Sequence, residues 1–212
     1  FLPEMSTLPL SQTVRHVGLF LAVVWGVYLL DWMFPAKFVD WGIIPRRLSG
    51  LIGIPLSPFI HDGIGHLISN SIPLAILLFL FIASRKTAWL RIIEVALLGG
   101  LFLWLFGRNG TEGNVVHVGA SGLIYGLIAY LIVVGLREKQ PVSIAIALLV
   151  GFLYGGTLLW GVLPTNAHVS WDGHLAGAVA GALLAFYFPN ESRPADTESP
   201  VDLLKRHGFD VE

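Results

Sequence analysis

Six apolar segments dominate this 212-residue chain, each close to the ~20 residues that a helix needs to cross a bilayer. The chain is 55% hydrophobic and 13% charged, with a mean hydropathy of +0.73, which is too apolar for an ordinary soluble domain. In lipid a backbone must satisfy its own hydrogen bonds, so the sequence predicts an all-α membrane protein built as a six-transmembrane-helix bundle. The predicted spans are 17–30 with its flanks, 64–83, 89–106, 118–136, 142–163 and 169–188.

The spans divide the chain into a polar tail over residues 1–16, a helical domain over 17–188 and a second polar tail over 189–212. The first connection, residues 35–60, is long and apolar. Pro35, Pro45, Pro55 and Pro58 interrupt it, and prolines this frequent exclude a regular spanning helix. We therefore expect an external loop that lies in the membrane interface. The absence of an internal repeat disfavours an inverted-repeat transporter.

Basic residues predict the orientation of the helices. Short cytoplasmic loops carry an excess of lysine and arginine, so the more basic side is expected to face the cytoplasm. This rule places both tails in the cytoplasm of a multi-pass protein of the cell (inner) membrane. The predicted inner side holds Arg15, Arg85, Lys86, Arg91, Arg137, Lys139, Arg193, Lys205 and Arg206, and the outer side holds Lys37, Arg46, Arg47 and Arg108.

A serine between glycines stands at the predicted outer end of the fourth span, in the stretch Gly119-Ala120-Ser121-Gly122. Glycine and serine are common at helix interfaces in lipid, so Ser121 has a packing interpretation as well as a catalytic one. A histidine, His174, stands at the same end of the sixth span. A serine hydroxyl becomes a good nucleophile only beside a base, so the pair predicts a catalytic dyad if the two helices pack together.

A third polar pattern lies at the outer end of the second span, where His61, His66 and Asn70 follow one another. His66 and Asn70 are spaced i and i+4, so both side chains lie on one helix face. Polar side chains inside a span are costly and usually face a cavity or each other. Interhelical hydrogen bonding and stabilisation of a reaction intermediate are both consistent with this pattern.

Taken together, the three patterns in this order resemble the rhomboid intramembrane serine proteases, over about residues 17–188. The resemblance implies that Ser121 and His174 form the dyad. It also implies that His66, Asn70 and the Ser121 backbone N–H stabilise the oxyanion, and that the substrates are transmembrane segments of other proteins, cut near the outer face of the bilayer. Supporting roles fall on Tyr125, whose ring would pack on His174, and on Gly119, Gly122, Gly177, Gly181 and His61.

Other classes of function find less support in the sequence. Cysteine is absent and no His-Glu-x-x-His pattern occurs, so neither a thiol nucleophile nor a metal site is predicted, and no cofactor is expected. Scattered basic residues and a net charge of −1 give no reason to expect nucleic-acid binding. An inactive relative that binds membrane segments and, less favoured, a transporter stay open as alternatives. Asp172 is expected to cap the sixth helix.

Overall fold

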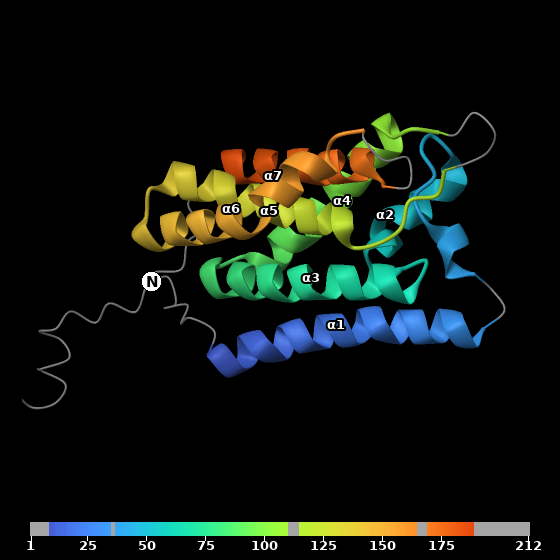
Figure 1. Cartoon of the computed structure of the whole chain (residues 1–212), viewed down its shortest axis with the longest axis horizontal. Helices are drawn as coiled ribbons and strands as arrows, with labels where there is room; N and C mark the ends of the chain where they lie inside the picture. Colours follow the sequence, from blue (N-terminus) through green and yellow to red (C-terminus); the bar gives the residue numbers. More distant parts are fainter. Residues whose placement is uncertain (1–8, 35–36, 110–114, 165–168, 189–212) are drawn as a thin grey trace, which may run out of the picture.

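A computed structural model describes residues 9–34, 37–109, 115–164 and 169–188. In this part of the chain the long helices lie side by side along the long axis of the molecule, with α1 beside α3 and α5 next to α6 and α7 (Figure 1). Its α-helices are α1 (Leu10–Met33), α2 (Gly53–Leu56), α3 (Ile64–Ser84), α4 (Ala88–Phe106), α5 (Ser121–Glu138), α6 (Pro141–Gly161) and α7 (Trp171–Tyr187), and its 3₁₀ helices are η1 (Phe38–Trp41), η2 (Leu48–Ile52) and η3 (Ser57–Phe59).

Five of these helices, α1, α3, α4, α5 and α6, are long and apolar enough to cross a membrane. With 17 residues, α7 is shorter than each of the five. The bundle also exposes large apolar side chains along its length; on α6, for example, Phe152 is 87% exposed and Leu148 is 70% exposed. Such surfaces suit lipid and not water. The predicted all-α membrane bundle is confirmed.

The structure differs from the predictions at the start of the first helix and in the first loop. Helix α1 begins at Leu10 and so includes residues 10–16, which were predicted to belong to the tail. The loop over 35–60 is not irregular throughout, because η1, η2, α2 and η3 lie in it. Proline breaks a long helix but fits its first turn, where no N–H donor is needed. Pro58 occupies such a position in η3, and the loop therefore consists of short helical turns.

Helix α5 forms the centre of the core, where Leu127, Ile128, Tyr130 and Leu131 are almost completely buried. It meets α7 through glycines. A Cβ atom on Gly177 would overlap the carbonyl oxygen of Gly122, and one on Gly181 would overlap that of Gly126. The two backbones are in direct contact, as small residues allow between membrane helices. This contact brings the first turns of α5 and α7, which carry Ser121 and His174, close together.

The first loop is attached to the segment that leads into α5. Ile43 and His117 exchange two backbone hydrogen bonds of 2.9 Å, and the Gly119 N–H donates to the carbonyl of Ser57 at 2.9 Å. Ile43 is buried in this contact, whereas Trp41 is 47% exposed. One face of the loop thus packs on the bundle and sets the position from which Ser121 starts its helix.

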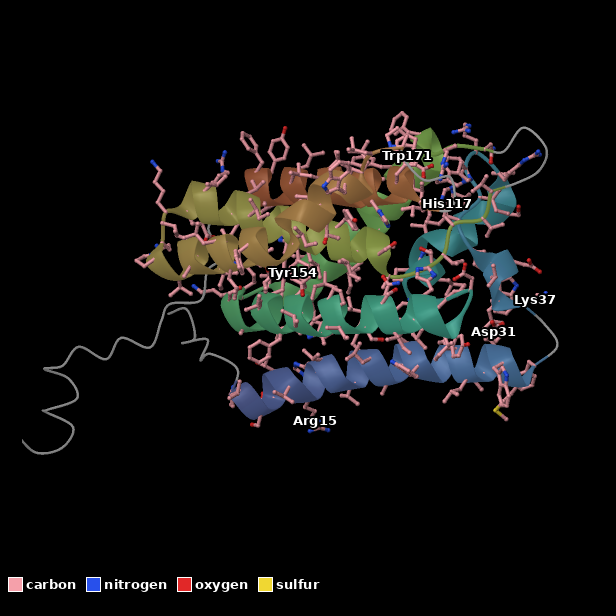
Figure 2. All side chains as sticks on the ribbon, in the orientation of Figure 1. Arg15, Asp31, Lys37, His117, Tyr154 and Trp171 are labelled. Atoms are coloured by element: carbon pink, nitrogen blue, oxygen red, sulfur yellow. The ribbon has the colours of Figure 1, made fainter. Side chains whose placement is uncertain are left out.

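At the opposite end of the bundle, a buried ion pair joins three helices. The guanidinium of Arg85, only 1% exposed, donates to Glu138 at 2.6 Å and to Ser143 at 3.0 Å. Ser143 in turn donates to Glu138 at 2.6 Å. Because the three residues belong to the ends of α3, α5 and α6, this network fixes the first turn of α6. In Figure 2 Arg15 lies in the left half of the molecule, and Lys37, His117 and Trp171 lie in the right half.

Candidate active site

The three predicted motifs meet at a single cavity of about 380 Å³. Ser121 from α5, His174 from α7 and His66 from α3 all line it, although they are far apart in the sequence. The remaining lining residues are Asp62, Val116, His117, Val118, Val169 and Ser170. Two serines, three imidazoles and a carboxylate therefore face one space.

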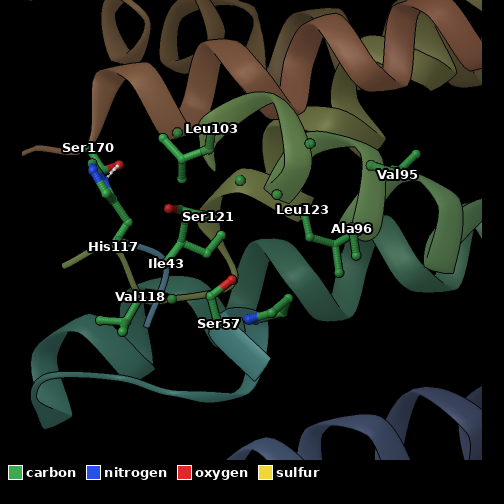
Figure 3. A pocket seen from close by; sticks show the side chains of 16 residues that line it. Ile43, Ser57, Val95, Ala96, Leu103, His117, Val118, Ser121, Leu123 and Ser170 are labelled. Atoms are coloured by element: carbon green, nitrogen blue, oxygen red, sulfur yellow. Dashed lines mark hydrogen bonds between the residues drawn. The ribbon is translucent and has the colours of Figure 1, made fainter. Parts of the chain in front are cut away.

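Ser121 is the first residue of α5, directly after a turn that only glycine suits. Gly119 has φ of +105°, and a Cβ atom on it would lie 2.5 Å from Nε2 of His66. A side chain at Gly119 would thus be strained and would also collide with the His66 ring. Ser121 borders a second, smaller cavity of about 40 Å³ together with Ser57 and Ser170 (Figure 3).

The ring of His174 is held on two sides. It stacks on Tyr125, with centroids 4.0 Å apart and planes 8° apart, and its Nδ1 lies 2.9 Å from the carbonyl oxygen of Gly161. Because a carbonyl only accepts, Nδ1 carries a hydrogen, and Nε2 of the neutral ring has the free lone pair that a base requires. Within the described residues Ser121 and His174 share the cavity without a hydrogen bond between them. Catalytic hydrogen bonds are often long before substrate binds.

His66 is oriented by a carboxylate. Its Nδ1 lies 2.6 Å from Oδ1 of Asp62, one turn earlier in the chain. A carboxylate accepts hydrogen bonds, so Nδ1 is the protonated nitrogen, and Nε2 is the one that approaches Gly119. Next to it, His61 packs edge-on against His66 with ring centroids 5.1 Å apart. Burial, followed by the charge of His66, lowers the pKa of His61 to about 4, so His61 is neutral at pH 7.

Asn70 is 5% exposed and lies one turn further along α3 than His66. Its Nδ2 donates to the carbonyl oxygen of His66 at 2.9 Å, and it is not among the residues that line the cavity. The amide has two hydrogens, so this bond leaves one of them for another acceptor. The structure thus brings His66 to the cavity, whereas Asn70 does not line it.

The predicted N-cap role of Asp172 is wrong. Helix α7 begins at Trp171 with Ser170 as its N-cap residue, and Asp172 lies inside the first turn. Its carboxylate instead accepts the backbone N–H of Arg108 at 2.8 Å and lies 3.4 Å from the guanidinium. An acidic side chain in the first turn also suits the helix dipole. Asp172 therefore connects α7 to the end of α4.

Sequence reasoning missed three contacts of the site. The acceptor for His174 is the backbone of Gly161, and a carbonyl group leaves no mark in a sequence. The partner of His66, Asp62, has the i, i+4 spacing that could have identified it. Ser170 bonds to His117 across a separation of 53 residues, for which no local pattern exists.

Comparison with known proteins identifies the family of the chain. A family model described as the Rhomboid domain matches residues 48–191. An uncharacterized protein of Mycobacterium tuberculosis is 40% identical over 182 residues, covering 83% of this chain and 75% of that protein. The Rhomboid-like protein 11, chloroplastic, of Arabidopsis thaliana is 27% identical over 202 residues, covering 82% and 66%. The match to the family model extends over more than half of the chain, from the first loop through α7, and so the chain belongs to the Rhomboid family.

Proposed function

We propose that this protein is an intramembrane serine endopeptidase that hydrolyses peptide bonds in or near transmembrane segments of other proteins. The observation that carries the proposal is the cavity that Ser121, His174 and His66 share, with His174 stacked on Tyr125 and bonded through Nδ1 to Gly161. This arrangement leaves Nε2 of His174 available as the base for a serine in the same cavity.

In the proposed reaction, the Ser121 hydroxyl gives its proton to Nε2 of His174 while Oγ attacks the carbonyl carbon of the scissile bond. The tetrahedral intermediate then collapses, and the imidazolium returns the proton to the leaving amine. A water molecule next attacks the acyl-serine ester, with His174 again taking and returning one proton, and releases the new carboxyl end. Tyr125 keeps the ring in place through the stack and through its own hydrogen bond of 2.9 Å to the Thr157 carbonyl.

The oxyanion needs donors at the cavity. The Ser121 backbone N–H, at the first turn of α5, is one of the N–H groups that a helix leaves unpaired. His66 can donate from Nε2 only when both ring nitrogens are protonated, because Nδ1–H already faces Asp62. The Asp62 carboxylate supplies the countercharge for that imidazolium. Asn70 adds a further donor. One hydrogen of its amide is bonded to the His66 carbonyl oxygen, and the other is available for the oxyanion.

The proposed substrate class sets a requirement on the segment that is cut. A peptide bond in a regular helix has its carbonyl hydrogen-bonded and inaccessible, so a substrate segment must unwind locally before Ser121 can attack. We therefore expect small or helix-breaking residues near the scissile bond. Water reaches the cavity from the outer side, since hydrocarbon excludes it.

Chemical modification tests this proposal directly. The purified protein, incubated with a model transmembrane substrate, is expected to cleave it, and a serine-directed phosphonylating reagent is expected to stop cleavage and to modify Ser121, as mass spectrometry would detect. A chelator is expected to leave cleavage intact. Loss of activity to the chelator, restored by zinc, would contradict the serine mechanism and support metal hydrolysis instead.

Substitution of Asn70 tests whether this residue has a catalytic or only a structural role. If its amide donates to the oxyanion, Asn70→Ala is expected to lower kcat by roughly 10- to 1000-fold with little change in KM or thermal stability. If Asn70 only bonds within α3, stability should fall by roughly 1 kcal/mol with normal kcat per folded molecule. Turnover and unfolding measured on the same preparation decide between the two roles. Lower stability with normal kcat per folded molecule would remove Asn70 from the site.

The orientation is a further prediction. We expect both termini in the cytoplasm and the cavity at the outer face of the cell membrane. The chain has no cysteine, so single cysteines can be introduced at Arg47, in the first loop, and at Gln140, between α5 and α6. Both positions are exposed. An impermeant maleimide should label only the Arg47→Cys variant in intact cells; labelling of only Gln140→Cys would reverse the orientation.

A further inference from the structure

The segments that carry Ser121 and His174 are joined by a second contact that the proposed reaction does not use. His117 precedes Ser121 by four residues, and Ser170 precedes His174 by four. The Nδ1 atom of His117 lies 2.7 Å from Oγ of Ser170. One side-chain hydrogen bond therefore links the segment before α5 to the segment before α7. It lies beside the shared cavity, which His117 and Ser170 also line.

This contact belongs to a partly buried group that we call the outer polar cluster, formed by Arg108, His117, Ser170 and Asp172. His117 is 4% exposed and Asp172 is 8% exposed. Oγ of Ser170 lies 3.5 Å from Oδ1 of Asp172, and Nε2 of His117 lies 3.8 Å from Oδ2 of Asp172. The 2.7 Å contact between His117 and Ser170 holds one hydrogen, which either the His117 Nδ1–H or the Ser170 hydroxyl donates, and in both cases the bond joins the two side chains.

The outer polar cluster is held from α4 as well. Arg108 donates its backbone N–H to Asp172 and its Nη2 to the carbonyl of Val169, both at 2.8 Å. Burial lowers the pKa of His117 below its ordinary value, while Asp172 opposes that shift in part. His117 is therefore neutral at pH 7 and acts as a hydrogen-bond partner and not as a charge.

The glycine contact between α5 and α7 explains why such a link matters. Where Gly122 and Gly126 meet Gly177 and Gly181, the facing surfaces are backbone, with no side chains to interlock. Backbone contact fixes how closely the helices approach, but side-chain interdigitation is what normally fixes their axial register. Beside the stack of Tyr125 on His174, the hydrogen bond between His117 and Ser170 adds such a constraint at the N-terminal ends of both helices, next to the reacting groups.

We propose that His117 is a positioning residue that, through Ser170, sets the placement of Ser121 relative to His174. The inference rests on the proposed protease function and deepens it. A displacement of about 1 Å between reacting groups is enough to lower a rate by about 100-fold. The effect of losing this bond should therefore appear in kcat, whereas substrate affinity and the fold are maintained by other contacts.

Two substitutions of His117 test the proposal as a matched pair. In His117→Asn the amide occupies about the place of Nδ1 and can still form a hydrogen bond with Ser170, as donor or as acceptor, whereas in His117→Gln the amide extends to about the place of Nε2. We expect His117→Gln to lower kcat by roughly 10- to 100-fold with unchanged KM and unfolding midpoint. His117→Asn should stay within about threefold of the wild type. Ser170→Ala should match His117→Gln, and the double variant should be no worse than either.

The outcomes separate this inference from the proposed function. A wild type that cleaves through Ser121, together with an unimpaired His117→Gln, overturns the inference alone. The inference is also overturned if His117→Gln and His117→Asn lose the same activity and that loss matches the loss of folded protein, because this result indicates a purely structural role. Modification of Ser170 by the phosphonylating reagent overturns it in favour of a second nucleophile. A wild type that cleaves no better than Ser121→Ala removes the proposed function and this inference with it.

Discussion

Replacing Ser121 by alanine is expected to reduce cleavage of a transmembrane substrate by roughly 10⁴-fold or more, to the background of the assay. Without the hydroxyl no acyl-enzyme forms, and the remaining donors of the cavity have no nucleophile to assist. The alanine removes one oxygen atom at the first position of α5, so the fold should be preserved. Initial rates and unfolding midpoints of both proteins, purified in parallel, measure the effect.

The matched control is Ser11→Ala, which removes a hydroxyl from an exposed position near the start of α1. It should cleave like the wild type. His174→Ala should be nearly as inactive as Ser121→Ala, and the double variant no worse than the single ones, because the two residues act as a unit. Equal cleavage by wild type and Ser121→Ala would contradict the protease function and leave the binding of membrane segments as the better interpretation of this fold.

Gly177→Ala is expected to destabilise the protein more than any other single-methyl substitution discussed here. The added Cβ would overlap the carbonyl oxygen of Gly122, and a backbone atom cannot rotate away as a flexible side chain can. Overpacking of this kind costs about 1–3 kcal/mol or more. Activity should fall further than stability, because moving α7 away from α5 also moves His174 away from Ser121.

Gly155→Ala is the control for this substitution. Gly155 lies in the middle of α6, and a Cβ atom there would meet no other atom within 4 Å. Alanine is a better helix former than glycine by up to about 1 kcal/mol, so this variant should be as stable as the wild type or slightly more stable. Thermal unfolding of the two variants should therefore shift in opposite directions; a midpoint for Gly177→Ala equal to that of the wild type would contradict the close contact between α5 and α7.

The sequence predicts the bundle well because lipid imposes a simple rule on composition and length. Its predictions fail where water and lipid meet. Helix α1 extends back to Leu10 because polar residues such as Arg15 can continue a helix beyond the hydrocarbon, where hydropathy no longer marks it. The turns of the first loop were missed because Pro55 and Pro58 were interpreted only as helix breakers, although proline is also compatible with a first helical turn.

Part of the candidate site could also be predicted from the sequence, and part could not. Glycine spacing predicts the approach of α5 and α7, since Gly122 and Gly177 leave room for backbone contact. The His117–Ser170 bond depends on single side chains from two loops, and periodicity cannot indicate such a pair. The orientation of His174 depends on the Gly161 carbonyl, which every residue type possesses.

The hydrogen bond between His174 and the Gly161 carbonyl has a consequence for ligand binding. The Gly161 carbonyl accepts from His174, and the Thr157 carbonyl accepts from Tyr125, whose ring stacks on His174. Both carbonyls belong to the last turns of α6, whereas the first turn of α6 is fixed by Ser143 and its ion pair. By thermodynamic linkage, a ligand that binds better when the His174 ring is held must favour the docked C-terminal end of α6 to the same extent. Covalent occupancy of Ser121 would then slow amide hydrogen exchange in a helix that contributes no side chain to the reaction.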